Sequence, residues 1–455
     1  MISTIMLGNR AETIFLFLGD MCMFYIALVF TLLLRYGNSL FDLQRMLMLH
    51  LAPFSILFLL WTFVFFIAGL YEKHTLFLQK QLPQLLSRAL FVNVLLSILF
   101  FYFIPSFKIA PKLNLFIYLF VSSALLFVWR RQRLALVRNA VRESAALIGT
   151  GEEMDRIKKE ITSNSRYRIT FSLLVDTGET PLPEATDLAK RMRDSNITLV
   201  IADMHNSRVE ALLPHLYEFL FSGIRFLDMH KVYEDLFDRI PLSLIRYHWF
   251  LEHISVVSSN LAYDFLKRFT DIVAAGVLGV LSLTVYPFVY LAIKLDDGGK
   301  LFVLQQRVGQ RGALMRTIKF RTMSRDDAGL PGLKAGNKVT RVGAFLRRTR
   351  IDELPQLWNV LRGEMSLIGP RPELPSLVEI YEREVPYYTI RHLIKPGLSG
   401  WAQLYHKTPP KVNADSSETT TKLSYDLYYL KHRSFWLDIK IALKTVKVLL
   451  SRSGV

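Results

Sequence analysis

The hydrophobic positions of the chain gather first into four long apolar stretches. They lie at about 11–34, 50–70, 85–104 and 113–129. Each is close to the roughly 20 residues that an α-helix needs to cross the hydrocarbon core of a bilayer. The pattern therefore predicts four transmembrane helices, although a hydrophobic soluble bundle would show a similar pattern.

A cluster of arginines follows the fourth stretch, in "WRRQRLALVRNAVR" at 129–142. Loops on the cytoplasmic side of a membrane carry an excess of Lys and Arg, so we expect the chain after this point to be cytoplasmic. Four crossings would then place the N-terminus on the same side. The first stretch contains Asp20 and is followed by others, so we expect no cleaved signal peptide.

From about residue 144, short apolar runs alternate with amphipathic segments. This alternation is typical of a doubly wound parallel sheet. The expected strands are "AALIGTG", "ITFSLLVD", "ITLVIAD" and "IRFLD", and the expected helices are "EEMDRIKKEI", "DLAKRMRDS" and "RVEALLPHLYEFL". The turn Gly149-Thr150-Gly151 has two glycines of a dinucleotide fingerprint, and Asp176 ends the next strand, but Met154 stands where the third glycine belongs. We therefore favour a plain strand-to-helix turn over a nucleotide site.

A further apolar run of about 25 residues begins after Lys267 and Arg268. Its length would permit a fifth crossing, but Pro287 inside the run favours a kink there. A kinked helix that enters and leaves by one face is the alternative. The residues of the run leave both possibilities open.

The last apolar segment, "WLDIKIALKTVKVLL" at 436–450, is amphipathic. One face carries Lys440, Lys444 and Lys447, and another carries Trp436, Ile439, Leu443 and Val446. The pattern suits a helix at a membrane surface, and it equally suits a helix whose apolar stripe packs in a core.

Composition agrees with a membrane protein that has a sizeable soluble part. Of 455 residues, 51% are hydrophobic and 21% are charged, with a mean hydropathy of +0.26. The single cysteine, Cys22, excludes an intrachain disulfide and a zinc site built on paired thiols. The net charge of +17 suits nucleic acid or an anionic membrane face. Because much of the basic excess flanks apolar segments, we favour the membrane and expect no nucleic-acid partner.

Candidate chemistry lies in "RIDELPQLWNVLRGEMSLIGPRP" at 350–372. Asp352 is predicted to cap the start of a helix, with Pro355 in its first turn and Gly363 at its end. A carboxylate there meets the positive end of the helix and nearby arginines, so we expect it to be ionised at neutral pH. The alternative is an ordinary cap beside a solvated Glu353.

Further along, Gly369-Pro370-Arg371-Pro372 fixes an arginine between rigid turn residues. A planar guanidinium suits phosphate oxygens. We therefore expect Arg347, Arg371 and Lys407 to meet an anionic substrate beside an acidic pair, Asp352 and Glu353, that holds Mg²⁺. The chain contains no HExxH, no GxSxG and no complete Walker phosphate loop, so phosphate chemistry of another kind is indicated.

Several blocks after residue 262 resemble the bacterial sugar transferases called polyprenyl-phosphate phosphoglycosyl transferases, the monotopic superfamily. They are "KRFTD", "QQRVGQRG", "IKFRTM", "TRIDELPQLWNVLRGEMSLIGPRP", "RHLIKPGLSGWAQ" and "YDLYYLKHRS". The four spans and the central α/β region extend the likeness to the large members of that family. The resemblance implies a membrane α-helical bundle at 1–135 and a cytoplasmic Rossmann-like (flavodoxin- or CoA-binding-like) domain at 143–250. It also implies an α/β catalytic domain at 258–455, with a re-entrant membrane helix at about 265–293 and interfacial amphipathic helices.

The resemblance also implies an activity. The enzyme would transfer a phosphosugar from a UDP-sugar to polyprenyl (undecaprenyl) phosphate with release of UMP, starting exopolysaccharide, capsule or O-antigen repeat units. Asp352 would be the nucleophile of a covalent phosphosugar intermediate, and Glu353 would hold Mg²⁺ or assist proton removal. The substrate phosphates would be bound by Arg347, Arg371, Lys407, Lys319 and Arg321. The active site would lie at the cytoplasmic face of the bacterial inner membrane, in an arrangement compatible with a homodimer.

Some positions depart from the family pattern. Thr284 stands where the helix-breaking proline usually lies, Lys300 replaces a usual proline, and "YHKTPPKVNADSSETT" replaces the usual loop after GWAQ. A different class of protein, a non-catalytic membrane sensor that reads a nucleotide through the central α/β domain, would be expected to have lost catalytic residues. Asp352, Glu353 and Arg371 are all present, which favours the enzyme.

Overall fold

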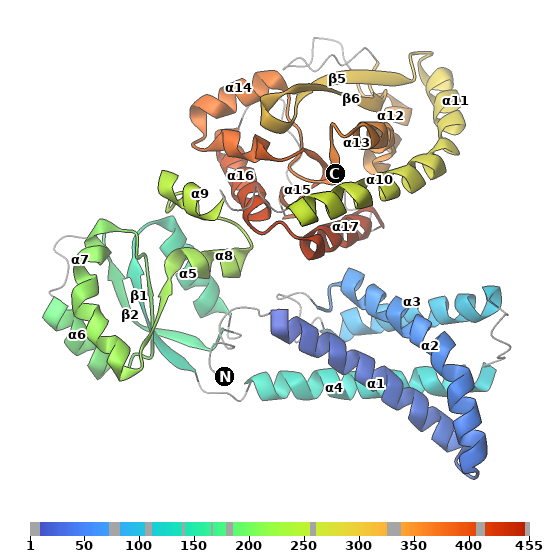
Figure 1. Cartoon of the computed structure of the whole chain (residues 1–455), viewed down its shortest axis with the longest axis horizontal. Helices are drawn as coiled ribbons and strands as arrows, with labels where there is room; N and C mark the ends of the chain where they lie inside the picture. The colour runs from blue at the N-terminus through green and yellow to red at the C-terminus, as the bar shows by residue number, and fades with distance from the viewer. Residues whose placement is uncertain are drawn as a thin grey trace. The chain divides into compact units, whose positions relative to one another are not determined.

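The computed structural model describes residues 10–71, 82–104, 112–138, 142–164, 167–178, 185–254, 261–324, 338–405 and 415–450. The chain forms two compact units, Met1–Leu236 (unit 1) and Phe237–Val455 (unit 2). Figure 1 shows their helices and strands.

Unit 1 begins with the four predicted apolar helices. They are α1 (Arg10–Tyr36), α2 (Leu40–Ala68), α3 (Leu82–Phe103) and α4 (Lys112–Arg138). All four are long and apolar enough to cross a membrane. Aromatic side chains form the centre of the bundle, where Phe24, Phe58, Trp61 and Tyr118 are fully buried. The prediction of four spanning helices is confirmed by length and composition.

A buried ion pair joins the first and fourth helices. Arg130 of α4 donates from Nε to Asp20 Oδ1 of α1 over 3.1 Å, and Tyr71 OH donates to Asp20 Oδ2 over 2.8 Å. Arg130 Nη1 also donates to the carbonyl oxygen of Leu70 over 3.1 Å. Charged groups inside an apolar bundle are costly unless paired. Arg130, which the sequence pattern counts as a flanking charge, is therefore part of the bundle interior.

The rest of unit 1 is a parallel four-stranded sheet with the order β2-β1-β3-β4. Its elements are β1 (Glu143–Gly149), α5 (Glu152–Ser163), β2 (Ile169–Asp176), α6 (Ala185–Asp194), β3 (Leu199–Ala202), α7 (Ser207–Leu216), η4 (Tyr217–Ser222), β4 (Arg225–Asp228) and α8 (Met229–Phe237). The predicted strands, helices and parallel pairing are confirmed. Gly151 has φ 87° where the turn meets α5, so this glycine serves the turn itself.

Unit 2 is an α/β body whose sheets are small. It contains α9 (Tyr247–His253), α10 (Leu261–Leu283), α11 (Tyr286–Asp296), β5 (Phe302–Val308), η6 (Gln310–Gly312), β6 (Leu314–Phe320), α12 (Arg341–Thr349), η7 (Ile351–Gln356), α13 (Leu357–Arg362), β7 (Ser366–Ile368), α14 (Pro375–Glu384), η8 (Tyr388–Leu393), β8 (Gly397–Ser399), α15 (Trp401–Tyr405), α16 (Ser416–Lys431) and α17 (Phe435–Leu450). Strands β5 and β6 form an antiparallel hairpin, and β7 pairs with β8 in parallel. Residues Ile240, Trp249 and Phe250, within the range predicted for the central domain, pack in the core of unit 2.

Helices α10 and α11 are bent by 52° at a break of two residues. Pro287 lies in the first turn of α11, where its missing N–H costs no helical hydrogen bond. Near the break, Ser282 Oγ donates to the carbonyl oxygen of Gly279, and Thr284 Oγ1 donates to that of Leu281, each over 2.7 Å. These hydroxyls bond to backbone carbonyls near the break, as Ser and Thr commonly do in apolar helices. The predicted kink at Pro287 is present.

Candidate active site

The acidic pair lies in a tight turn between two helices. Asp352 and Glu353 belong to the 3₁₀-helix η7, which joins α12 to α13. Arg350 ends α12 with φ 59°, and Gly363 ends α13 with φ 84°. The helix end at Gly363 was predicted correctly, but the prediction that Asp352 caps a helix is wrong. The left-handed residue Arg350 precedes the turn, and three residues per turn direct the two neighbouring carboxylates about 120° apart.

Glu353 is the centre of an ion-pair cluster. Its Oε1 accepts from Arg371 Nη2 over 2.7 Å and from Lys319 Nζ over 3.4 Å, and Arg350 Nη1 lies 3.8 Å away. Burial on its own would raise the pKa of Glu353, but Arg371 and Lys319 outweigh that effect and hold it well below its usual range. Glu353 is therefore ionised throughout the physiological pH range.

Asp352 has the opposite environment. Only 8% of the residue is exposed, and Oδ1 is buried without a hydrogen-bond partner among the described residues. Burial and the charge of Glu353 raise the pKa of Asp352 to about 6, although Lys319, Arg347 and Arg350 oppose the shift. Asp352 is thus mostly ionised at neutral pH, as expected, but it is a more basic carboxylate than a helix cap would be.

Arg371 is held by backbone contacts that only glycines permit. A Cβ atom at Gly397 would lie 2.0 Å from the backbone nitrogen of Gly369, and one at Gly400 would lie 2.3 Å from the carbonyl oxygen of Gly369. The close approach allows Gly369 N to donate to Ser399 O and Gly397 N to donate to Pro370 O, each over 2.8 Å. The two family blocks "IGPRP" and "KPGLSG" therefore fix the backbone on both sides of the arginine.

A buried arginine supports the same turn from the other side. Arg391 Nη2 donates to the carbonyl oxygen of Arg371 over 3.0 Å. The same guanidinium forms a buried ion pair of 2.8 Å with Asp426 of α16. Arg391 comes from "RHLIKPG" and Asp426 from "YDLYYL", so two further blocks act on the position of Arg371.

The other predicted substrate-binding residues differ in their surroundings. Lys319 contacts Glu353, and burial lowers its pKa against the opposing charge of Glu353. Arg347 Nε donates to Thr322 Oγ1 over 2.9 Å, and its charge acts on Asp352. Arg321 instead bonds to Asp297 Oδ2 over 2.8 Å and to the carbonyl oxygens of two neighbours. Lys407 lies outside the described residues.

Two residues to which the sequence pattern gave no role also shape the site. Arg307 of β5 lines a small cavity with Lys319, Arg371 and Gln356, and its charge acts on Lys319. Asn359 is fully buried; its Oδ1 accepts from Ile318 N over 3.2 Å and its Nδ2 donates to Arg316 O over 2.7 Å. These bonds join α13 to β6. Both residues lie in the blocks "QQRVGQRG" and "DELPQLWNV", which are the only signal for them in the sequence.

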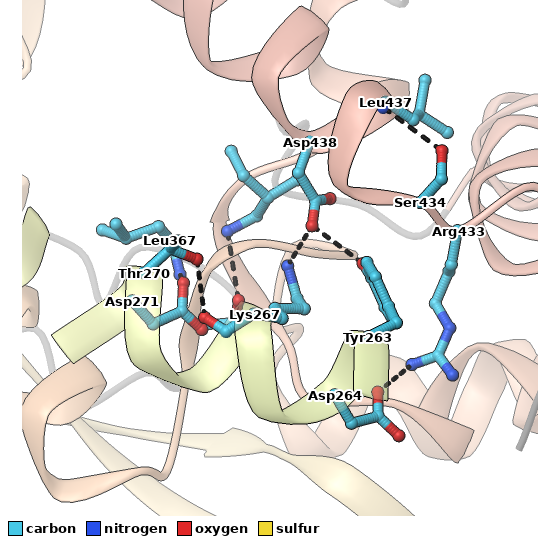
Figure 2. A network of polar contacts seen from close by, with 12 residues as sticks. Tyr263, Asp264, Lys267, Thr270, Asp271, Leu367, Arg433, Ser434, Leu437 and Asp438 are labelled. Carbon is cyan, nitrogen blue, oxygen red and sulfur yellow. Dashed lines mark hydrogen bonds and ion pairs between the residues drawn. The ribbon is translucent and has the colours of Figure 1, made fainter. Parts of the chain in front are cut away.

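Helix α10 is attached to the site by a polar network, shown in Figure 2. Asp438 Oδ2 of α17 accepts from Tyr263 OH over 2.8 Å and from Lys267 Nζ over 3.0 Å. Asp271 Oδ1 accepts from Leu367 N over 3.0 Å. Next to Lys267, Arg268 donates to the carbonyl oxygens of Val360 and Leu361, over 2.7 and 2.8 Å. The block "KRFTD" therefore binds the end of α13 and the start of β7.

The arrangement fits a divalent cation together with substrate phosphates. Mg²⁺ prefers oxygen ligands and is commonly bound by one or two carboxylates plus phosphate oxygens. Asp352 Oδ1 is a buried carboxylate oxygen that makes no hydrogen bond among the described residues. Lys319, Arg371 and Arg307 add positive charge near Glu353 and the small cavity. Within the described part of the chain, a carboxylate oxygen that makes no hydrogen bond therefore lies near fixed cations, an arrangement that could bind a metal ion together with a phosphate.

Comparison with known proteins places the second half of the chain in one family. The family model for bacterial sugar transferases matches residues 262–452. A UDP-N-acetylgalactosamine-undecaprenyl-phosphate N-acetylgalactosaminephosphotransferase of Aeromonas hydrophila is 43% identical over 42% of this chain and 45% of its own length. An undecaprenyl-phosphate glucose phosphotransferase of Komagataeibacter xylinus is 32% identical over 66% of this chain and 58% of its own length. The chain thus spans about half the length of these two relatives.

A shorter relative is covered more fully. A UDP-glucose:undecaprenyl-phosphate glucose-1-phosphate transferase of Caulobacter vibrioides is 38% identical over 42% of this chain and 72% of its own length. The region matched by the family model contains the acidic pair, the glycine-supported arginine and, apart from Leu261, the bent helix pair described above.

Proposed function

The chain belongs to the bacterial sugar transferase family, and from this premise we propose that it transfers a phosphosugar from a UDP-sugar to a polyprenyl phosphate, with release of UMP. The observation that carries the proposal is the buried carboxylate of Asp352. It has an oxygen without a hydrogen bond among the described residues and lies beside Glu353, whose partners are Arg371 and Lys319. The related proteins named above act on UDP-sugars or undecaprenyl phosphate, which supports the substrate classes.

In the first step, ionised Asp352 attacks the phosphorus atom that carries the sugar. The new bond joins the carboxylate oxygen to phosphorus, and the anhydride bond to the uridine phosphate breaks, so UMP leaves with the electron pair. A pKa of about 6 suits this role, because the carboxylate is ionised at pH 7 yet more basic than an ordinary aspartate.

In the second step, a phosphate oxygen of the lipid attacks the same phosphorus atom. The bond to Asp352 breaks, the carboxylate is regenerated, and the product is a polyprenyl-diphosphate sugar. Arg371, kept in place by Glu353 and the glycine contacts, would neutralise the oxygens of the transferring phosphoryl group. Arg347 and Lys319 are proposed to bind the remaining phosphate charge, and Arg321 and Lys407 retain this role as predictions from the family resemblance.

Asp352, with Glu353 beside it, would hold the Mg²⁺ that we propose as cofactor. When bound, the ion would neutralise phosphate charge and strengthen the electrophilic character of phosphorus. Glu353 is already paired with three cations, so its share in binding the ion would be smaller than that of Asp352.

We propose that α10 and α11 form a re-entrant membrane helix. Asp271 of α10 accepts from Leu367 N, and Asp296 of α11 accepts from Val342 N over 3.0 Å, so both arms bond to the same α/β body. If this folded body lies on one side of a membrane, the start of α10 and the end of α11 lie on that same side. Between these bonds the exposed residues are mostly apolar, including Val277, Val280, Leu281, Phe288 and Leu291.

The C-terminal helix α17 supports a location of unit 2 at the membrane interface. Lys440 and Lys444 of α17 lie over the Trp401 ring, at 4.9 and 5.7 Å from its centroid. Of the predicted apolar stripe, Trp436 is 60% exposed and Val446 is 43% exposed, while Ile439 and Leu443 are partly buried. Leu437 and Ile441, on another face of α17, pack in the core of unit 2, so the helix leaves part of its stripe available to a membrane surface. We therefore propose that α17 rests on the membrane surface. We further propose that the catalytic unit lies at the cytoplasmic face of the bacterial inner membrane, and that the parallel sheet of unit 1 is a Rossmann-like domain.

The deciding experiment measures UMP release by the full chain in detergent. A panel of UDP-sugars is offered with Mg²⁺, with and without polyprenyl phosphate. We expect lipid-dependent release with the preferred sugar, and a stoichiometric burst of UMP without lipid, in which the protein mass grows by one phosphosugar. Asp352→Asn should abolish both, whereas the matched control Glu379→Gln, an exposed carboxylate on α14, should retain them.

Folded protein that releases no UMP from any UDP-sugar would contradict the proposed donor class. Turnover by Asp352→Asn at the wild-type rate would contradict the covalent step while leaving the transfer itself in place.

A further inference from the structure

A second cluster of polar side chains lies in unit 1, at the carboxyl edge of the parallel sheet. The tripeptide Asp-Met-His occurs twice, at 203–205 after β3 and at 228–230 at the end of β4. The two strands are neighbours, and Ala202 pairs with Asp228, so the tripeptides lie side by side with an offset of one residue. Ligand sites of open α/β sheets lie at this edge.

The two carboxylates and two imidazoles converge across the two strands. His230 Nε2 lies 3.6 Å from Asp203 Oδ1, and His205 Nδ1 lies 3.9 Å from Asp228 Oδ2. The two imidazole rings are 4.8 Å apart between centroids. One ligand atom of each residue lies within 4.8 Å of all the others, and this is the only such group of three or more among the described residues. Each histidine therefore faces the carboxylate of the other tripeptide.

His230 is the feature that sets this cluster apart from an ordinary surface pair. The residue is 4% exposed, and neither ring nitrogen makes a hydrogen bond with the described residues. Burying polar atoms without hydrogen bonds costs free energy, so such a group usually has another partner. Asp203 is also buried, whereas His205 and Asp228 are partly exposed. An ion could therefore reach the site from solvent past His205 and Asp228 and bind to the buried Asp203 and His230.

We propose that Asp203, His205, Asp228 and His230 bind one divalent transition-metal ion of the Zn²⁺ class. Two imidazoles and two carboxylates are a ligand set that suits Zn²⁺, and the two carboxylates balance its charge. Ligand atoms of a tetrahedral zinc site lie about 3.4 Å apart, given bonds of about 2.1 Å. Small side-chain rotations would bring the four atoms from their present spacing to that distance. The site is independent of the transferase chemistry and would join β3 to β4.

Zinc binding by the full chain in detergent, freed of any affinity tag, tests the proposal. Equilibrium dialysis against buffered Zn²⁺ should give one ion per chain, and Co²⁺ in its place should show the intense visible bands of four-coordinate cobalt. His205→Ala and Asp228→Asn should each raise the zinc dissociation constant at least about tenfold. His248→Ala, which removes an exposed imidazole outside the cluster, should leave it unchanged.

Because His205 and Asp228 are partly exposed, their substitution should leave the unfolding temperature in chelator unchanged, which separates ligand loss from misfolding. Zn²⁺ should raise the unfolding temperature of the wild type and of His248→Ala, but not of the two cluster variants. Equal zinc affinity in all four proteins, no zinc bound by the wild type, or binding of Mg²⁺ in preference to Zn²⁺ would overturn the proposal.

Discussion

Arg371 Nη2 lies 2.7 Å from Glu353 Oε1, so the arginine fixed between two prolines is the partner of the second residue of the acidic pair. This pairing lowers the pKa of Glu353 and leaves its negative charge to raise that of Asp352. Two adjacent carboxylates therefore have opposite properties. Glu353 stays ionised through its ion pairs, and Asp352 is a more basic carboxylate whose Oδ1 makes no hydrogen bond among the described residues.

The pH dependence of the reaction follows from the pKa of Asp352, about 6. In the proposed mechanism the ionised carboxylate is the active form, so kcat/KM for UMP release should fall about tenfold per pH unit below pH 6. Arg350 lowers the pKa of Asp352, so Arg350→Gln should move this acid limb to higher pH. Arg383→Gln, an exposed arginine on α14, should not. A rate that stays constant through pH 6 would contradict the role of Asp352.

Replacing Arg371 should damage activity. Arg371→Gln leaves Glu353 with weaker cationic partners, and we expect it to reduce kcat/KM by about a hundredfold or more. Arg371→Lys keeps the charge but not the planar fork and should recover only part of the loss. Steady-state UMP release measures both variants, with Arg383→Lys as the matched control. Full activity in Arg371→Lys would show that position and charge suffice.

The glycine contacts around Arg371 predict a strong effect of a single methyl group. Gly397→Ala places Cβ 2.0 Å from Gly369 N, so the backbone beside Arg371 must move. Because a displacement of about 1 Å at a catalytic group can reduce the rate about a hundredfold, we expect Gly397→Ala to lower the rate of UMP release by about that factor.

Gly276→Ala is the control, because outside its own helix no described residue lies within 4 Å of a Cβ at this position. It should be neutral or stabilising by up to about 1 kcal/mol. Thermal unfolding and UMP release measure both variants, and equal activity in the two would contradict the prediction.

The Asp438 network predicts how firmly α10 is held. The Asp438 carboxylate pairs with Lys267 and accepts hydrogen bonds from the hydroxyls of Tyr263 and Tyr429. Asp438→Asn removes its negative charge. We expect a loss of about 3 kcal/mol in unfolding free energy, because the Lys267 side chain, which is only 14% exposed, is left without its carboxylate. Asp264→Asn, whose partner Arg433 is 3.5 Å away and whose side chain is 43% exposed, should cost less than 1 kcal/mol. Denaturant unfolding in detergent distinguishes the two, and equal losses would refute the ranking.

The re-entrant helix can be tested with single cysteines, because Cys22 is the only native one. In a Cys22→Ser background, Leu261→Cys and Lys300→Cys place exposed thiols at the two ends of the bent pair. A membrane-impermeant maleimide should label both in inverted vesicles and neither in right-side-out vesicles. Labelling of the two positions from opposite sides would mean that the pair crosses the membrane.

The sequence by itself determined the local elements of this protein. Apolar length predicted the four N-terminal helices, alternating runs predicted the parallel sheet, and Pro287 and Gly363 marked a helix break and a helix end. These features depend on residues within a few positions of one another, so periodicity and turn chemistry suffice to predict them. The motif at 350–372 also indicated the acidic pair and Arg371 as candidate site residues.

Only the tertiary structure decided what those residues do to one another. Arg321 pairs with Asp297 and not with the acidic pair, Arg350 rather than Asp352 occupies the position before η7, and burial makes Asp352 more basic. The two Asp-Met-His tripeptides, 25 residues apart in the chain, meet because β3 and β4 are neighbours. Distances and desolvation of this kind arise from packing between segments far apart in sequence, and no local pattern encodes them.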